Sequence, residues 1–508
     1  MKPARSSIAV RSIAAPSAAH RRRGQRLHRG RRGLSVVLVV LVLGLLIAFA
    51  ALAVDVGRMR LAKAQLQTAA DAAAAAAASG MQLFPERGVL EPQERAVDAA
   101  DRNFVIDQRQ EDGERQDRGV ELIPDEDMQF GRWNDVTREF ELLEAGGTTD
   151  RRRQADAVRV WTRRVTRFED ADGNLVDRGN GLPLILVPVL RIFSEKMPIT
   201  GELQTRAVAT LNGQVDVAAF VGLQYVRFTG ATRSDSYDAA LGGYPGHGAA
   251  KRNSSIATNG EVTFNGAATI RGSVFPGKGQ WIQPQPLSSS VDISGYMFPL
   301  TKTLTAVTPS FTLPPISNEP NTIDPTNVVS ETDKSFNAAN NQTTTLQSLP
   351  KNNASTNFVF SSWTSKANDE IEIKNDQSPV EIWITGDFNH SGKAQIKVMS
   401  PLHPVTFHVN GDMTIVGNGV VTNGPPHNLQ ILMSRPNTTL RMGGSQPISA
   451  HVSAASSDVI FSGNGTGSYH FFGRVVGQSL TVASNVELHY DESLGTLTDP
   501  KFQIRLVE

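Results

Sequence analysis

The chain has 508 residues, enough for two or three domains, and its 50 basic residues balance its 50 acidic ones. A net charge of zero offers no whole-molecule field for nucleic acid or an anionic surface, so we expect no nucleic-acid partner. Cysteine is absent, which excludes disulfides, thiol nucleophiles and cysteine metal sites.

Residues 34–54 form an apolar stretch of 21 residues without a charge, from Leu34 through Gly44 to Val54. As a helix this stretch would be about 31 Å long, close to the thickness of a hydrocarbon core. Most of its residues are Leu, Val, Ile or Phe, and each favours insertion by about 0.3–0.6 kcal/mol near the helix centre. The sequence therefore predicts a transmembrane helix, with the lipid bilayer as a partner.

A basic arm, residues 1–33, precedes this helix and contains no Asp or Glu. Positive charges close to a spanning helix keep their side in the cytoplasm. The arginines that we expect to determine the topology are Arg21, Arg22, Arg23, Arg26, Arg31 and Arg32. The alternative is a long signal peptide cleaved near Ala50, but the length of the apolar run favours retention.

The helix is predicted to continue beyond the membrane through residues 55–80. No Pro or Gly interrupts the sequence between Arg58 and Ser79, strong helix formers dominate it, and Gly80 offers a stop. Alanines fill residues 69–78 almost completely, and small side chains permit close approach of another helix. High helix propensity alone explains these alanines equally well.

The order of motifs in this region resembles the N-terminal part of TadE/TadG-like proteins, which are associated with assembly of Flp (tight-adherence) pili. The resemblance rests on an Arg-Arg-Gly lead, an apolar helix that runs into Asp55 and Gly57, and a Leu-Gln-Thr-Ala-Ala-Asp segment that ends at Asp71. It implies that Asp55, Gly57 and Asp71 are family markers without a catalytic role. It also implies a place in the bacterial inner membrane and contact with other pilus-assembly membrane proteins through the helix extension. A prepilin cleaved after Gly33 would have Glu where this chain has Leu38, so we expect no such processing.

Residues 81–224 are mixed in composition and are predicted to form a small α+β domain outside the cytoplasm. A short helix is expected over residues 91–105, with Ala96, Val97, Ala100 and Phe104 on one face. Strands are expected at residues 120–123, 128–133, 157–165, 184–193 and 203–211. The order of these segments also resembles the periplasmic region of TadG-like chains.

Residues 225–508 are rich in Gly, Asn and Ser and contain short Val/Ile/Phe runs. Residues 380–388 repeat as residues 405–413, each an alternating strand closed by a Gly-Asp turn. Such recurrence predicts a right-handed parallel β-helix, with a β-sandwich as the alternative. Residues 301–350 are expected to form a long loop or insertion. This half also resembles uncharacterised β-helical domains of bacterial surface proteins.

Three partial motifs are interpreted as turns. Residues 272–279 lack the Ser or Thr and the helix of a phosphate-binding loop, residues 387–391 match a von Willebrand A metal motif incompletely, and residues 170–174 lack EF-hand ligands at both ends. The histidines are scattered, although Asp387 and Asp412 could lie near each other on neighbouring repeats. We therefore predict no catalytic residue, no cofactor and no metal ion.

The sequence thus predicts a non-enzymatic, membrane-anchored envelope protein that assembles or scaffolds a Flp pilus. One alternative is a surface adhesin that binds a glycan or another surface ligand. A second is a membrane-tethered β-helical carbohydrate-active enzyme, which would need several ionisable side chains to converge in a groove of residues 255–490.

Overall fold

The computed structural model describes residues 32–105, 119–144, 151–165, 167–169, 175–177, 181–185, 200–214, 219–285, 287–314, 335–338, 343–350, 355–463, 467–483, 485–495 and 501–507. The chain divides into two compact units, one of Met1–Gly57 with Leu184–Ile199 and one of Arg58–Pro183 with Thr200–Glu508. Helix α1 contributes residues to both units.

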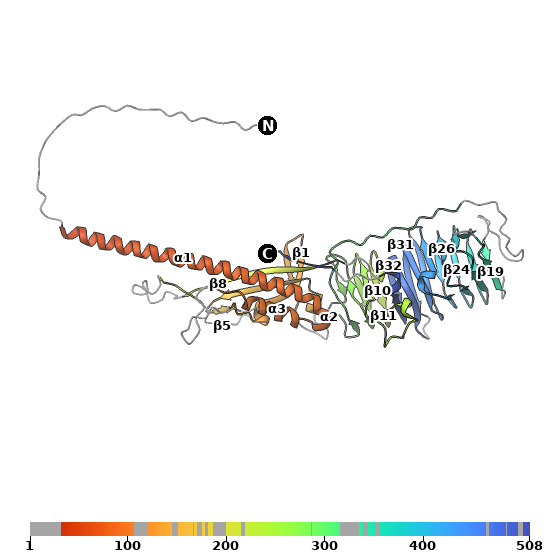
Figure 1. Ribbon diagram of the computed structural model, residues 1–508, viewed down its shortest axis with the longest axis horizontal. Helices are drawn as coiled ribbons and strands as arrows, with labels where there is room; N and C mark the ends of the chain where they lie inside the picture. Colours follow the sequence, from red (N-terminus) through yellow and green to blue (C-terminus); the bar gives the residue numbers. More distant parts are fainter. Residues whose placement is uncertain are drawn as a thin grey trace, which may run out of the picture. The chain divides into compact units, whose positions relative to one another are not determined.

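Helix α1 (Arg32–Gly80) is 49 residues long, so the predicted continuation of the apolar helix is confirmed (Figure 1). Gly80 ends the helix but keeps a right-handed φ of −67°. The reason for glycine there is close packing, because a Cβ at Gly80 would lie 2.7 Å from the Cα of Pro92. The other helical segments are η1 (Met81–Leu83), α2 (Phe84–Arg87), α3 (Leu90–Asp101) and α4 (Pro124–Asp127).

An antiparallel sheet with the strand order β2-β1-β3-β8-β34 forms the α+β part. Its strands are β1 (Met128–Asn134), β2 (Glu139–Leu142), β3 (Ala157–Arg164), β8 (Leu203–Gln214) and β34 (Lys501–Leu506). Side chains alternate across a strand, so Phe130, Val158 and Ala209 share one face, and this face packs against α1 and α3. Strand β34 belongs to this sheet although the sequence assigned its residues to the β-rich region.

Several short elements differ from the sequence prediction. Residues 120–123 form no strand, because the Val120 N–H donates to the carbonyls of Ala100 and Asn103 at the end of α3 instead of to a neighbouring strand. Helix α3 stops at Asp101, so Phe104, which was predicted to lie on one face of this helix, is outside it and 57% exposed. Of the predicted strand at residues 184–193, positions 184 and 185 are not in a strand, and the remainder lies outside the described residues.

Two small antiparallel pairs complete this part of the chain. They are β4 (Arg167–Glu169) with β5 (Leu175–Asp177), and β6 (Leu182–Pro183) with β7 (Thr200–Gly201). The first pair confirms the predicted hairpin, whose turn at residues 170–174 lies outside the described residues.

Residues 220–293 form what we term the first strand array. Its elements are β9 (Phe220–Gly222), β10 (Val226–Thr229), β11 (Thr232–Tyr237), η3 (Ala239–Leu241), β12 (Ile256–Thr258), β13 (Val262–Asn265), β14 (Ala268–Ile270), β15 (Val274–Phe275), β16 (Ile282–Gln283) and β17 (Val291–Ile293). Strands β9 to β14 each pair in parallel with the strand one repeat further on, for example β10 with β13 and β11 with β14.

Residues 336–491 form the second strand array. One set of elements is β18 (Phe336–Asn337), β20 (Thr356–Phe360), β21 (Trp363–Ser365), β23 (Val380–Ile384), β24 (Phe388–His390), β26 (Val405–Val409), β27 (Met413–Ile415), η4 (Pro426–Asn428), β29 (Leu429–Met433), β30 (Thr438–Gly444), β31 (Ile448–Gly463), β32 (Tyr469–Ala483), β33 (Val486–Asp491) and η5 (Glu492–Leu494). A separate parallel sheet contains β19 (Thr343–Gln347), β22 (Glu370–Lys374), β25 (Gln395–Val398) and β28 (Val420–Thr422).

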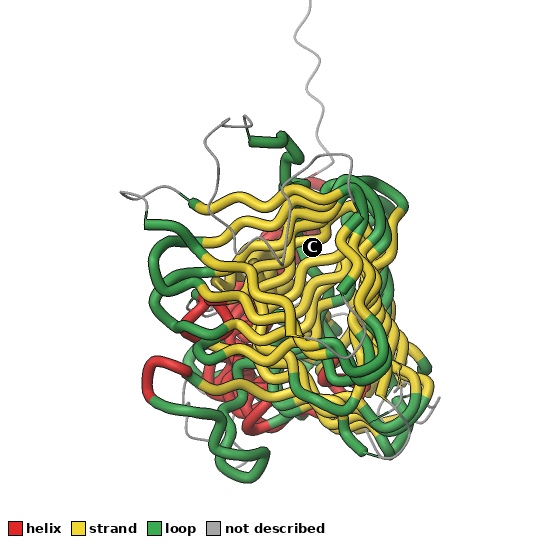
Figure 2. The backbone as a smooth tube through the Cα atoms, turned by 90° about the vertical axis from the view of Figure 1, so that its right-hand side faces the viewer, coloured by secondary structure: helices red, strands yellow, loops and turns green. Residues whose placement is uncertain are grey.

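The predicted repeat is confirmed by strand register, since Val380 pairs with Val405 and Ile384 with Val409. Viewed from one end, the strands of successive repeats lie over one another (Figure 2). Their inward Ile, Val and Phe side chains form one continuous buried cluster. The strand registers within both arrays are parallel, whereas a hairpin-connected sandwich would require antiparallel ones.

The two arrays join where β10 and β11 pair with β32 and β33. The chain thus begins the arrays at the join, with β10 and β11, and runs through the first array to β17 at one end. It continues with β18 at the other end and returns through the second array to β32 and β33 at the join. Residues 301–314, part of the predicted insertion, contain no strand and pass along the arrays (Figure 1). Thr308 Oγ1 lies 2.6 Å from Ser456 Oγ, and the Phe311 ring packs against Trp383. Later in that insertion β18 and β19 replace the predicted loop.

Candidate functional site

Helix α1 exposes a continuous apolar surface over its N-terminal half. Large apolar side chains between Val36 and Val56 are 40–66% exposed, and the helix segment Val36–Leu83 is long and apolar enough to cross a membrane. A Cβ at Gly44 would meet nothing within 4 Å, so this position is a notch in the exposed surface. Among the topology arginines, Arg32 begins α1 and the others lie outside the described residues.

Asp55 follows the apolar segment and is only 5% exposed. Its Oδ1 accepts a hydrogen bond of 2.8 Å from the backbone N–H of Ile185, 130 positions later in the chain. The Asp55 carboxylate therefore holds a distant segment against the helix. Gly57, by contrast, has open space where a side chain would stand, so packing does not require glycine there.

The C-terminal half of α1 packs against its own α+β domain. Fully buried alanines follow one helical stripe, namely Ala62, Ala69, Ala70, Ala73, Ala74, Ala77 and Ala78. Thr162 Oγ1 of β3 donates to the carbonyl of Leu66 (2.9 Å), and Gln67 Nε2 donates to both Asp71 Oδ1 (2.9 Å) and the carbonyl of Arg206 (3.0 Å). Asp71 therefore orients the side chain that links α1 to β8.

This packing changes the interpretation of the alanine-rich stretch. Small side chains let α1 approach the sheet closely. The alanine stripe is therefore buried against residues of the same chain. The exposed apolar part of α1, which includes Gly44, takes no part in this packing.

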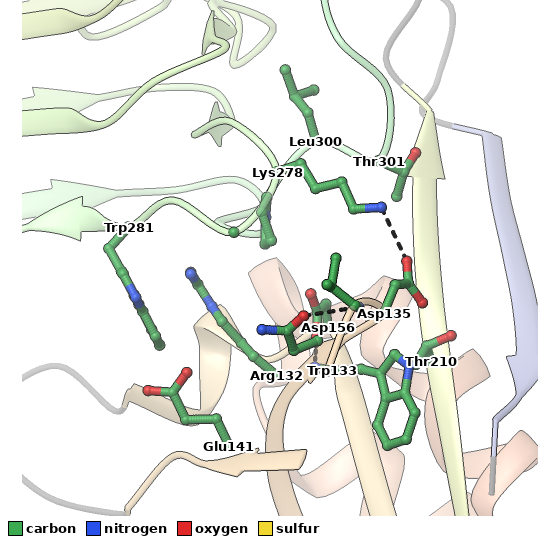
Figure 3. A pocket seen from close by; sticks show the side chains of 14 residues that line it. Arg132, Trp133, Asp135, Glu141, Asp156, Thr210, Lys278, Trp281, Leu300 and Thr301 are labelled. Atoms are coloured by element: carbon green, nitrogen blue, oxygen red, sulfur yellow. Dashed lines mark hydrogen bonds and ion pairs between the residues drawn. The ribbon is translucent and has the colours of Figure 1, made fainter. Parts of the chain in front are cut away.

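A cleft of about 460 Å³ lies between the α+β sheet and the first array (Figure 3). The Arg132 guanidinium carbon lies 3.4 Å from the Trp281 ring centroid, its Nη1 donates to the carbonyl of Gln280 (2.6 Å), and burial lowers the pKa of Arg132 to about 10. Asp156 accepts the Trp133 N–H at 2.9 Å, and burial raises the pKa of its carboxyl to about 6.

The same cleft accounts for the motif that resembles a phosphate-binding loop. Lys278 Nζ lies 3.1 Å from Asp135 Oδ2, and the turn leads into β16 instead of a helix. Arg132, Asp156 and Lys278 are each engaged by the chain itself. Arg132 and Lys278 therefore attach a turn of the first array to the sheet.

The partial motif at residues 387–391 also has a structural role. Asp387 and Asp412 do lie on neighbouring repeats, where Asp387 Oδ1 accepts the Asp412 N–H (3.0 Å) and Asp412 Oδ1 accepts the Thr439 N–H (2.8 Å). Each carboxylate accepts a backbone N–H of the next repeat. His390 is buried between Ser365 Oγ (2.6 Å) and the carbonyl of Gly419 (3.1 Å).

Three ionisable side chains converge where the arrays join, and sequence reasoning missed them. His470, Glu487 and His489 place their side-chain donor atoms within 4.8 Å of one another. The sequence offered no signal for this cluster, because β32 and β33 come together only through parallel pairing.

Two family models match the chain. Residues 33–80 match the family described as putative Flp pilus-assembly TadE/G-like, which confirms the resemblance of the N-terminal region. Residues 317–497 match a domain of unknown function, DUF7305. Neither a curated protein nor a solved structure matches the chain.

Proposed function

We propose that this chain is a non-enzymatic, membrane-anchored scaffold for Flp pilus assembly. Helix α1 carries the proposal, because its residues 33–80 match a pilus-assembly family and its first half has the length and composition of a membrane span. In this proposal the basic arm is cytoplasmic, α1 crosses the inner membrane, and the arrays lie outside the cytoplasm.

The C-terminal half of α1 is part of the folded body in this proposal. The alanine stripe of α1 packs against the sheet, and Thr162, Gln67 and Asp71 add polar links. We propose that partner membrane proteins contact α1 at the notch of Gly44, since small residues allow close helix approach in lipid.

We further propose that the two arrays form a right-handed parallel β-helix. Parallel pairing at offsets of 24 or 25 residues, as between Thr356, Val380 and Val405, supports a coiled path. Such a body presents a long outer face, which an adhesin would use to bind a glycan or another surface ligand.

Deletion of the gene in a piliated host, followed by counting pili by electron microscopy, tests the scaffold proposal. We expect pili to be lost and to be restored by the wild-type chain. The variant Gly44→Leu fills the proposed contact notch and should restore fewer pili, whereas Leu45→Ala, beside it, should restore them fully. Unchanged piliation after deletion would overturn the proposal.

A tethered carbohydrate-active enzyme is the second candidate, and the cluster of His470, Glu487 and His489 is the observation that favours it. Glycoside hydrolysis ordinarily uses two carboxyl groups that flank the substrate. The other nearby carboxylate, Asp235, is fully buried and engaged by three hydrogen bonds. Release of reducing ends from envelope polysaccharides by the wild type, and its loss in Glu487→Gln, would support this candidate.

A further inference from the structure

The join of the two arrays brings together polar side chains from three neighbouring strands. Asp235 of β11 pairs with His489 of β33, and His470 of β32 pairs with Glu487 of β33. Side chains alternate along a strand, so these four project away from the core side that Leu488 occupies. His489 and Asp235 are nevertheless fully buried. The segment that follows β11 contributes His247 and Tyr244 against them.

The donor atoms of three side chains converge with the spacing of metal ligands. His470 Nδ1 lies 2.9 Å from His489 Nε2, and Glu487 Oε2 lies 3.6 Å from the former and 3.9 Å from the latter. Bonds of about 2.0–2.1 Å to a tetrahedral zinc ion place neighbouring ligand atoms about 3.3 Å apart. The three separations bracket that value, and two imidazoles with one carboxylate are a ligand set that zinc uses.

Contacts behind the proposed ligands fix the tautomer and the orientation of His489. Asp235 Oδ1 lies 2.7 Å from His489 Nδ1, so His489 donates there and keeps the lone pair on Nε2. Asp235 Oδ2 is engaged by Tyr244 and His247, each at 2.7 Å. Arg233 lies 3.6 Å from Glu487 Oε1 and leaves Oε2 for a metal.

We propose that His470, Glu487 and His489 bind one divalent transition-metal ion, zinc by ligand preference, through Nδ1, Oε2 and Nε2. The fourth position is left for water or an external ligand, because the His470 side chain is 36% exposed while His489 is fully buried. The ion links β32 to β33. Asp235 of the first array orients His489, the ligand on β33. Metal binding therefore stabilises the pairing of β32 with β33, the two strands to which the first array joins.

The test uses the full-length chain in detergent, purified with a tag that contains no histidine and stripped with a chelator. Zinc titrated by calorimetry should bind at about one ion per chain and raise Tm, because an ion that binds the native state stabilises it. Cobalt should give the visible absorption of a four-coordinate site. The variants His470→Ala and Glu487→Gln should abolish this binding, and Asp235→Asn should weaken it by about 10–100-fold.

His427→Ala is the matched control, since His427 is exposed and far from the cluster in sequence. It should bind zinc as the wild type does. Circular dichroism of the apo variants separates loss of binding from loss of fold. If apo wild type takes up no zinc, or if Glu487→Gln binds it unchanged, the 2.9 Å contact is a hydrogen bond from His470 to His489 and the proposal is overturned.

Discussion

At the scale of single residues, buried His390 makes the stability of the second array depend on pH. Burial lowers the pKa of His390 to about 4, whereas an unfolded histidine titrates near 6.5. Between these values the unfolded chain binds a proton that the native chain does not, so the free energy of unfolding falls as pH drops from 6.5 to 4. The loss reaches about 3 kcal/mol at its limit.

His390→Asn should remove this contribution. The difference in free energy of unfolding between pH 7 and pH 4.5, measured by urea denaturation, should be smaller by about 2–3 kcal/mol than in the wild type. His427→Asn, at an exposed position, should leave the difference unchanged. Equal pH dependence in His390→Asn and the wild type would contradict the prediction.

Asp156 acts in the opposite direction. Burial raises its pKa to about 6, so between an unfolded value of about 3.9 and pH 6 the native chain holds a proton that the unfolded chain releases. Stability therefore decreases as pH rises through this window, and the deprotonated carboxyl costs about 3 kcal/mol at pH 7. Asp156→Asn keeps an acceptor for the Trp133 N–H and removes the charge.

We expect Asp156→Asn to raise Tm at pH 7 and to lose that advantage at pH 4.5. Asp135→Asn, whose parent side chain is 42% exposed, should show no gain at pH 7. A Tm for Asp156→Asn below that of the wild type at pH 7 would show that its attraction to Arg132 outweighs the burial of its charge.

At the scale of elements, the alanine stripe of α1 is predicted to tolerate no bulk. Ala73 is fully buried against the sheet, whereas Ala64 on the same helix is exposed. Ala73→Leu should destabilise the protein by about 1–3 kcal/mol through overpacking, and Ala64→Leu should change little. Thermal unfolding of both variants checks this, and equal Tm values would mean that the helix does not pack as described.

Local sequence pattern predicted the elements whose stability is local. Helix propensity sufficed for α1, and alternation sufficed for β1, β3 and β8. The pattern failed at Val120, because the end of α3 takes up its N–H. The pattern also did not predict the hydrogen bond of Asp55, because its partner Ile185 is remote in the chain.

At the scale of the whole molecule, the contacts that sequence could not predict are those between distant strands. The repeat of residues 380–388 and 405–413 was visible because its partners are similar in sequence. The pairing of β34 with β8, in which Arg505 lies opposite Thr210, shows no similarity of sequence between its partners. The pairing of Asp235 with His489, on which the proposed metal site depends, shows no such similarity either.

The join of the arrays should couple their stabilities. Phe228 is 2% exposed, stacks on Phe264 with ring centroids 4.9 Å apart, and belongs to β10, which pairs with β13 on one side and β32 on the other. Phe228→Ala leaves a cavity that costs about 3–5 kcal/mol. Because neighbouring repeats stabilise one another, amide hydrogen exchange should accelerate in both β13 and β32.

Phe358→Ala is the matched control, since Phe358 is 1% exposed and its strand β20 lies near the far end of the second array. Its cavity is expected to cost a similar amount, but exchange should accelerate only in β18, β20, β21 and β23, because strands respond mainly to their direct neighbours. If Phe228→Ala accelerated exchange in β13 and left β32 protected, the two arrays would unfold independently. A metal ion at the join would then stabilise the second array alone.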